Sequence, residues 1–356
     1  MTTPSRRITV FIVDDSAVSR DLLTRVLSSD PEITVIGSAR SGAEAVTVLT
    51  EAKPNVVTMD IHMPGIDGFE ATRQIMESQP VPIVIVSASF DHGDVAKAFR
   101  AMEAGAVAAV EKPSGPGSPK YETLSQKLIE TVKTMSEVRV VRRWSRTRME
   151  PRVAEPVAVP RAAEEIRLVA IAASTGGPPV LQTLLTRLPK PCPVPVFIVQ
   201  HISAGFVEGL ADWLSTTTGM TVRLARHGEL AQPGIAYVAQ DRCQMSVGKD
   251  LRMVCGPEAA EHGLRPSASF LFRSIAETIG AAAAGVLLTG MGRDGAEELK
   301  RMRDAGAVTF AQDQESSVVH GMPGEAIRLG AAMHVGNPER IAATLHAMLA
   351  PRVVSP

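Results

Sequence analysis

The sequence predicts two α/β domains, each built on an open, doubly wound sheet of mostly parallel strands, with a linker between them. The 356 residues exceed what one hydrophobic core usually fills, so two domains are expected. Short β-branched runs alternate with amphipathic stretches in both halves, as in βα units around a buried sheet. The segment between the halves is rich in Arg, Pro, Ala and Glu, which is typical of a tether. We place the domains at 1–133 and 166–350 and the linker at 134–165.

Five short apolar runs in the first half predict a five-stranded parallel sheet. The predicted strands are Ile8–Val13, Ile33–Gly37, Val56–Met59, Ile83–Val86 and Ala106–Val110. Amphipathic stretches such as Val18–Leu27 and Gly68–Met76 predict the helices between them, and a last helical pattern covers Tyr121–Val138. In an open sheet of this kind, the ligand site lies at the carboxyl ends of the strands.

The second half repeats the alternation and adds a predicted antiparallel hairpin over Gln244–Cys255. The predicted strands are Leu168–Ala172, Val194–Gln200, Gly285–Thr289 and Val308–Asp313, with shorter strands near Val222 and Tyr237. One predicted helix begins after the first strand and ends at Leu188. The other predicted helices are Gly205–Thr217, Ser267–Thr278, Gly295–Ala305 and Pro338–Leu349. The second domain is therefore also expected to be α/β and doubly wound.

Composition predicts a cytoplasmic protein without nucleic-acid partners or direct membrane insertion. The net charge of −1 gives no general attraction to nucleic acid or anionic lipid, and we interpret the arginine-rich linker as a solvated tether. No run approaches the 18 to 20 apolar residues of a membrane span, and the N-terminus lacks the apolar core of a signal peptide. Cys192, Cys243 and Cys255 are widely spaced and form no CxxC pair, so we expect reduced thiols.

Polar residues follow four of the five predicted strands of the first domain. Asp14 and Asp15 follow the first strand and Asp60 the third, so one edge of the sheet is expected to gather three carboxylates. Such a cluster can bind Mg²⁺, and one carboxylate can accept a phosphoryl group. Ser87 and Lys112 complete this edge, and the lysine ammonium can neutralise a phosphoryl group. Taken singly, each residue also fits a helix cap, a turn or an ordinary surface position.

In the second domain, three strand ends carry a serine, a histidine and an aspartate. Ser174 lies between a strand and Gly176-Gly177 at the start of a helix, which resembles a nucleophile elbow with free N–H groups for an oxyanion. The pattern is A-x-S-x-G, so a helix N-cap is an alternative role for the serine. His201 ends the next strand and Asp294 follows a later one. A nucleophile, a base and an acid are therefore expected at one edge, whatever their order in the chain.

A competing interpretation concerns Gly290–Gly295, which reads G-x-G-x-x-G between a predicted strand and a helix. Asp313 lies 18 residues beyond its last glycine, close to the spacing of a ribose-binding acid in dinucleotide sites. However, Asp294 would place a carboxylate where the pyrophosphate must bind. We therefore disfavour a nicotinamide dinucleotide site.

The first domain resembles the receiver domains of two-component signalling over its whole length. The motifs that carry the resemblance are VDD, VTMDIHMPGIDG, VSAS and EKP. The resemblance implies that Asp60 accepts phosphate from a cognate histidine kinase. It further implies that Asp14, Asp15 and Asp60 bind Mg²⁺ and that Ser87 and Lys112 contact the phosphoryl oxygens.

The second domain, from about Leu168 to Leu349, resembles the catalytic domain of chemotaxis-type protein-glutamate methylesterases. Its motifs are AASTGGPPVL, IVQH, LRPSASFLF, GVLLTGMGRDGAEEL and AQDQESSVVHGMP, and a receiver joined ahead by a linker is the domain order of that family. The resemblance implies that Ser174 is the nucleophile, His201 the general base and Asp294 its orienting acid, with the backbone of Met291 as an oxyanion donor.

The combined resemblance implies a response regulator of chemotaxis that hydrolyses glutamate methyl esters on methyl-accepting chemoreceptors when phosphorylated. Deamidation of glutamine is an additional expected activity, and the hydrolysis itself needs no cofactor. The alternative is a catalytically silent, phosphorylation-dependent binding module. The chain departs from the family pattern at Ala109, where receivers commonly carry Phe or Tyr, at Ala172, where Gly is usual, and at Ile202-Ser203, where Met-Pro is usual.

Overall fold

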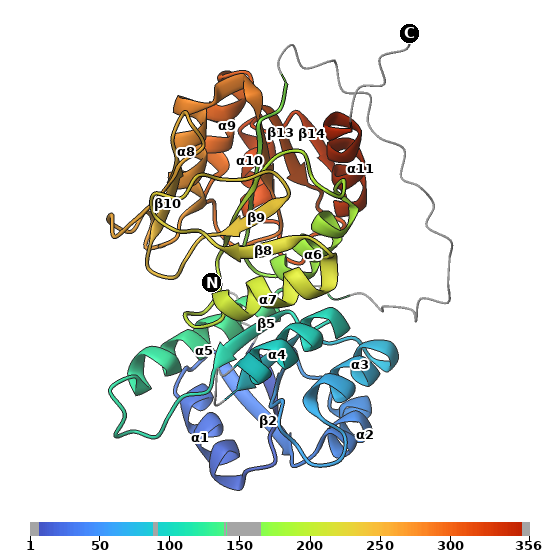
Figure 1. The fold of residues 1–356 in the computed structure, drawn as a ribbon. Coiled ribbons are helices and arrows are strands. Elements are labelled where there is room, and N and C mark those ends of the chain that lie inside the picture. The colour runs from blue at the N-terminus through green and yellow to red at the C-terminus, as the bar shows by residue number, and fades with distance from the viewer. Residues whose placement is uncertain (1–6, 88–91, 139, 141–164, 351–356) are drawn as a thin grey trace, which may run out of the picture. The chain divides into compact units, whose positions relative to one another are not determined.

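A computed structural model describes residues 7–87, 92–138, 140 and 165–350 of the chain. It divides into two compact units, Met1–Glu150 and Pro151–Pro356, each with its own core. Both units have the predicted α/β architecture (Figure 1). Most of the predicted linker falls outside the described residues. None of the described helices has the length and apolar character needed to span a membrane.

The first unit contains a five-stranded sheet in the order β2-β1-β3-β4-β5, with all its strands parallel. The strands are β1 (Ile8–Val13), β2 (Ile33–Ala39), β3 (Val56–Met59), β4 (Ile83–Ser87) and β5 (Ala108–Glu111). The helices are α1 (Ala17–Ser28), α2 (Gly42–Ala52), α3 (Gly68–Ser78), α4 (His92–Ala104) and α5 (Tyr121–Ser136). Helix α1 packs beside α5, and α3 packs between α2 and α4, so the sheet is doubly wound (Figure 1).

Local sequence explains where the elements of this unit begin. The central strands β3 and β4 are buried along their whole length, which accounts for their nearly continuous apolar sequence. Ser16, Ser41 and Asp67 each precede a helix and accept a hydrogen bond from a backbone N–H in its first turn. These caps fix the turns that follow β1, β2 and β3, and two of those turns carry the predicted acidic residues.

The second unit contains a seven-stranded parallel sheet in the order β14-β13-β12-β6-β7-β9-β8. Its strands are β6 (Leu168–Ala173), β7 (Val196–Gln200), β8 (Thr221–Leu224), β9 (Ile235–Val238), β12 (Ala283–Leu287), β13 (Val308–Gln312) and β14 (His334–Gly336). The predicted hairpin is formed by β10 (Gln244–Val247) and β11 (Met253–Gly256), which pair antiparallel outside this sheet.

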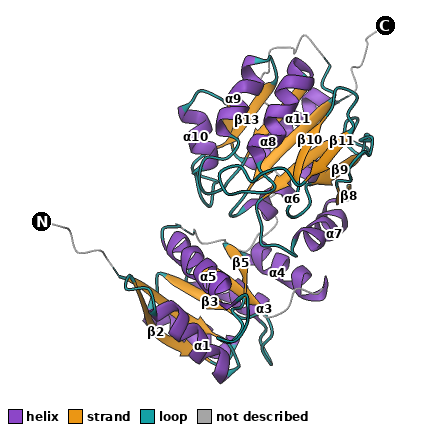
Figure 2. Ribbon diagram, turned by 90° about the vertical axis from the view of Figure 1, so that its left-hand side faces the viewer, coloured by secondary structure: helices purple, strands orange, loops and turns teal. Residues whose placement is uncertain are grey.

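Helices cover both faces of the seven-stranded sheet. They are α6 (Gly177–Arg187), α7 (Val207–Thr218), α8 (Ala268–Thr278), α9 (Ala296–Asp304), α10 (Met322–Arg328) and α11 (Pro338–Leu349), with a short 3-10 turn at Gly280–Ala282. Helix α6 packs between α7 and α11, while α9 packs between α8 and α10 (Figure 2). The chain places β7 on one side of β6 and later places β12 on the other. Open α/β sheets bind their ligands at such a reversal, which here lies at the carboxyl ends of β6 and β12.

The predicted fold class is confirmed, and most element bounds lie within two residues of the prediction. In the second unit α10, β14 and the short 3-10 turn at Gly280–Ala282 were missed. Helix α10 has seven residues and β14 has three, too few for hydrophobic periodicity to be recognised. Helix α5 continues to Ser136, so the domain boundary that we placed at residue 133 falls inside this helix.

The core of the second unit is expected to be sensitive to the stacked pair Phe197 and Tyr237, both fully buried, with ring centroids 5.9 Å apart. Phe197→Ala should lower the free energy of unfolding of this unit by about 3 to 5 kcal/mol, because it removes buried apolar surface and leaves a cavity. Urea titration followed by Trp213 fluorescence in a Trp144→Phe background measures it. Val254→Ala, at a side chain 39% exposed, is the control and should change it by less than about 1 kcal/mol. Equal effects of the two substitutions would contradict the assignment of this core.

Candidate active site

Ser174 lies in a tight turn between β6 and α6. Its N–H donates to the carbonyl of Thr289 at 3.0 Å, and its own carbonyl accepts from the N–H of Gly177 at 2.9 Å. Gly176 has a φ of +76°, and a Cβ there would lie 2.6 Å from Val318. The position therefore requires glycine for both its conformation and its packing. The turn leaves the Ser174 side chain partly exposed at the carboxyl edge of the sheet.

His201 and Asp294 meet at the same edge. Strands β6 and β7 are paired as far as Ala173 and Gln200, so Ser174 and His201 are the residues that follow on two neighbouring strands. The Nε2 atom of His201 lies 2.9 Å from Oδ2 of Asp294, with side chains only 11% and 2% exposed. The ring N–H is not aimed at this oxygen, so the contact is a close charge interaction more than an aligned hydrogen bond.

The Asp294 carboxylate is held by the N-terminus of α8. Oδ1 accepts from the Ser267 hydroxyl at 2.8 Å and from the Ser269 N–H at 3.1 Å, and Oδ2 accepts from the Ala268 N–H at 2.6 Å. Burial acts to raise the pKa of Asp294, but the close contact with His201 and the hydrogen bonds from Ser269 and Ser267 outweigh it and hold the pKa below its usual range. Asp294 is therefore anionic at neutral pH.

Our sequence interpretation missed these serines as partners of Asp294. A signal was present, because the predicted helix at Ser267–Thr278 begins with a serine, and residues at a helix N-terminus favour an anion. The Ser269 hydroxyl also accepts a hydrogen bond from the N–H of Gly295 at 2.9 Å. The α8 N-terminus therefore fixes both the carboxylate and the backbone next to it.

The loop after β12 packs directly against Ser174. A Cβ at Gly290 would lie 2.7 Å from the Cβ of Ser174. The Gly290 carbonyl accepts from the N–H groups of Gly321 and Met322 at 3.1 and 2.9 Å, and its N–H donates to Val319 at 2.9 Å. These bonds fix the start of the loop that continues into Met291, the predicted oxyanion donor.

The N-terminus of α6 offers fewer N–H groups than the sequence led us to expect. The N–H of Gly177 already bonds to Ser174, and the next two residues, Pro178 and Pro179, have none. Only the N–H groups of Thr175 and Gly176 within this turn are left for a developing oxyanion. The Thr175 carbonyl is held in place by the Thr289 hydroxyl at 2.9 Å.

Neither Asp294, within the G-x-G-x-x-G segment, nor Asp313, 18 residues beyond it, is free to serve a dinucleotide. The Asp294 carboxylate is buried against α8, as described above. Asp313 accepts from the Ser316 N–H at 2.9 Å and from its hydroxyl at 2.6 Å, so it caps a turn of its own chain segment. This geometry gives no support to the dinucleotide interpretation.

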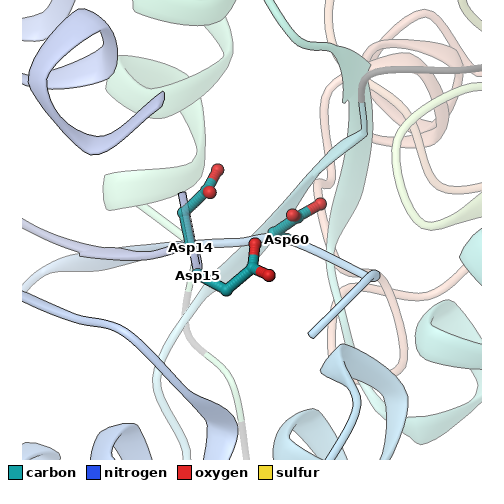
Figure 3. Close-up of side chains that lie close together, drawn as sticks. All are labelled: Asp14, Asp15 and Asp60. Atoms are coloured by element: carbon teal, nitrogen blue, oxygen red, sulfur yellow. The ribbon is translucent and has the colours of Figure 1, made fainter. Parts of the chain in front are cut away.

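In the first unit, the predicted acidic cluster is present (Figure 3). Ligand oxygens of Asp14, Asp15 and Asp60 all lie within 4.8 Å of one another. Three hard carboxylates with one member exposed fit Mg²⁺, which prefers oxygen ligands and retains several waters. The ammonium of Lys112 lies 2.7 Å from Asp14 Oδ2 and 3.3 Å from Asp60 Oδ2. Burial raises the pKa of Asp60, Lys112 opposes that shift and the negative charge of Asp14 adds to it.

Ser87 lies at the end of β4 and is buried, with its carbonyl accepting the Lys112 N–H at 2.8 Å. The helix cap that we considered as an alternative role for the acids applies in part to Asp14, which accepts a hydrogen bond from the Ser16 N–H at 2.9 Å. Ala109 lies on β5 opposite Ile85 and is half-buried. All five predicted receiver residues therefore lie at the carboxyl edge of this sheet.

Comparison with known proteins agrees with both units. Residues 169–345 match the CheB methylesterase family, and residues 10–118 match the response regulator receiver domain. A protein-glutamate methylesterase/protein-glutamine glutaminase of Nitrosospira multiformis is 51% identical over 97% of this chain and 98% of its own length. A relative of the same description from Geobacter metallireducens is 50% identical over 95% of this chain and 98% of its own length.

Among solved structures, the CheB methylesterase catalytic domain of Thermotoga maritima is 31% identical to the matching part of the chain. The match covers 52% of this chain and all of that domain, with a TM-score of 0.50. Together with the long matches to the two relatives, this likeness confirms the family resemblance seen in the sequence motifs. The chain therefore belongs to the protein-glutamate methylesterase/protein-glutamine glutaminase family, with a receiver domain ahead of its CheB methylesterase domain.

Proposed function

We propose that this protein is a serine hydrolase that cleaves glutamate methyl esters on chemoreceptors and that phosphorylation of its receiver domain regulates it. Ser174 is the nucleophile, His201 the general base and Asp294 the acid that orients His201. The observation that supports these roles is the 2.9 Å contact of His201 with Asp294 at the sheet edge where Ser174 leaves β6. Relatives of nearly the same length carry the corresponding name, which supports the substrate class.

In the proposed reaction, the Ser174 hydroxyl attacks the ester carbonyl while His201 takes its proton. Because Nε2 of His201 faces Asp294, Nδ1 is the ring nitrogen that accepts this proton. Methoxide is a poor leaving group, so His201 must return the proton as the bond to methanol breaks. Water then attacks the acyl-enzyme by the same route and releases the glutamate carboxylate.

The negative charge that develops on the carbonyl oxygen needs donors beside Ser174. The backbone N–H of Met291 is one proposed donor, because its loop is packed against Ser174 through Gly290. Backbone donors of this kind contribute about 10²- to 10³-fold to the rate. Met291 is 57% exposed, so we propose that its side chain also contacts the protein substrate.

The proposal extends to glutamine side chains, since the named relatives include that activity in their description. Attack by Ser174 on a carboxamide gives the same acyl-enzyme, and His201 protonates the leaving ammonia. The substrates are receptor domains on the cytoplasmic side of the membrane, so the protein is proposed to act in the cytoplasm. The proposed hydrolysis uses water together with side-chain and backbone groups of the chain itself.

In the receiver, we propose that Asp60 accepts phosphate from a cognate histidine kinase. Asp14, Asp15 and Asp60 would hold Mg²⁺, which offsets the charge of the phosphoryl oxygens when bound. Lys112 is within reach of the same oxygens, given its 3.3 Å distance from Asp60 Oδ2, and the Ser87 hydroxyl completes the contact. A phosphoryl group adds about two negative charges at this edge, which is the change that must alter esterase activity.

Ser174→Ala should lower esterase turnover by at least about 10³-fold without unfolding the protein, because it removes the attacking hydroxyl. Methanol release from methylated receptor is the measurement, with circular dichroism as the test of folding. Ser246→Ala on β10 is the matched control and should leave turnover unchanged. A folded Ser174→Ala variant with near-normal activity would refute the proposed nucleophile, and no methanol release by the parent would favour the silent binding module.

A small phosphodonor with Mg²⁺ should raise esterase activity of the full chain but not of Asp60→Asn, because only the parent can form the acyl phosphate. Asp67→Asn, in the same loop, removes an exposed acid that caps α3 and should keep the stimulation. Steady-state rates with and without the donor compare the three proteins. Stimulation of Asp60→Asn equal to that of the parent would exclude Asp60 as the phosphate acceptor.

A further inference from the structure

We propose that Gln200 is a positioning residue that fixes Ser174 and His201 relative to each other, an inference that rests on the catalytic roles proposed above. Gln200 is the last residue of β7 and is buried, with 3% of its surface exposed. Its Nε2 group donates to the Ser174 carbonyl at 2.7 Å and to the His201 carbonyl at 2.9 Å. Both hydrogens of one amide are therefore used on the two residues that exchange the proton.

The orientation of this amide is determined by its surroundings. Both partners of Nε2 are carbonyl oxygens, which can only accept hydrogen bonds. Rotation of the amide by half a turn would place Oε1 against those two oxygens and lose both bonds. Gln200 therefore has a single favourable arrangement, in which it acts as a double donor.

The oxygen of the same amide, Oε1, lowers the stability of the fold, and packing alone does not explain why it is there. Oε1 of Gln200 is buried and accepts no hydrogen bond in the described part of the chain. A Cβ at Gly177 would lie 2.2 Å from this oxygen, so residue 177 must be glycine for the amide to fit. An unpaired buried acceptor is destabilising, and an apolar side chain of the same length would avoid that penalty. We infer that this loss of stability is tolerated because the two donated bonds position Ser174 and His201.

The Gln200 amide connects the two chain segments just beyond the point where the pairing of β6 with β7 ends. The last residues paired between β6 and β7 are Ala173 and Gln200, and the His201 N–H still donates to the Ala173 carbonyl at 2.9 Å. Beyond this point the backbones of Ser174 and His201 diverge, one into the turn before α6 and the other into the loop before α7. The Gln200 side chain bridges their carbonyls at this divergence.

Loss of the bridge should impair chemistry more than binding. Gln200 is almost fully buried and bonds to the Ser174 and His201 carbonyls, so we expect its replacement to leave the exposed surface of the site unchanged. A misplacement of reacting groups by about 1 Å can cost about 10²-fold in rate. We therefore expect a lower kcat with little change in KM, which distinguishes positioning from substrate contact.

The first test is Gln200→Met, which keeps the length of the side chain and removes both hydrogen bonds. Its kcat for methanol release should fall about 10- to 100-fold, with KM changed less than about twofold. Thr309→Val is the matched control, because it removes two side-chain hydrogen bonds to backbone, with Ala331 at 2.6 Å and Met333 at 3.1 Å, from a fully buried residue of the same sheet. This control should keep its kcat within about twofold even where its Tm falls.

The second test is Gln200→Glu, which has nearly the same shape but donates one hydrogen bond only when its carboxyl is protonated. The ratio of its kcat to that of the parent should rise as pH falls from about 8 to about 6, since burial favours the protonated form. The same ratio for Gln200→Met should not depend on pH. All rates are measured well below the Tm of each protein, so that loss of folding does not enter.

These results separate the inference from the proposed function. If Ser174→Ala is inactive while Gln200→Met keeps its kcat, the positioning role is wrong and the nucleophile assignment stands. A raised KM with normal kcat would also overturn it, as would a pH-independent ratio for Gln200→Glu. Should Gln200→Met fail to fold, the pH dependence of Gln200→Glu decides alone. If Ser174→Ala remains active, the failure lies in the proposed function.

Discussion

A buried negative charge needs compensation, and in the hydrolytic unit this requirement organises the site around Asp294. Its carboxylate is only 2% exposed and is surrounded by the Ser267 hydroxyl, two N–H groups of α8 and the ring of His201. Each donor reduces the cost of burying the charge, and together they leave the carboxylate one orientation. The histidine is consequently positioned by the end of a helix that is itself anchored in the core. The Asp294 carboxylate thus links the position of the His201 ring to the packing of α8 in the core.

In the receiver, by contrast, the buried negative charge is only partly compensated. Three carboxylates are brought together, and only one cation of the described chain, Lys112, bridges two of them. The surplus negative charge favours a divalent cation and disfavours a full charge on Asp60, whose pKa is raised mainly by burial. In both units the carboxyl ends of parallel strands collect the reactive groups. The balance of charge differs between the two edges: the receiver edge carries surplus negative charge that suits a divalent cation, whereas Asp294 is stabilised by donors of its own chain.

The sequence was sufficient for the fold class and for the sheet edges because apolar strands and the residues that follow them are local features. Ser174, His201 and Asp294 each follow a short apolar run, and parallel strands necessarily bring such residues to one edge. The neighbours of β6 could not be predicted, since strand order depends on pairing between distant segments. Gln200 is a similar case. A polar residue at the end of an apolar strand was visible, but the two carbonyls it bonds to are defined only by the turn beyond it.

The hydrogen bonds around the elbow join segments that are far apart in the chain, and this bears on biosynthesis. The Thr289 hydroxyl binds the Thr175 carbonyl across 114 positions, and Gly290 is in turn held by residues 319–322. A nascent chain that has just exposed Ser174 therefore lacks the groups that shape its turn. They arrive only when most of the second unit has been translated, and folding by domains follows that order. The turn around Ser174 is therefore expected to form only once the chain has grown past residue 322, so a shorter nascent chain should be inactive although it already contains Ser174 and His201.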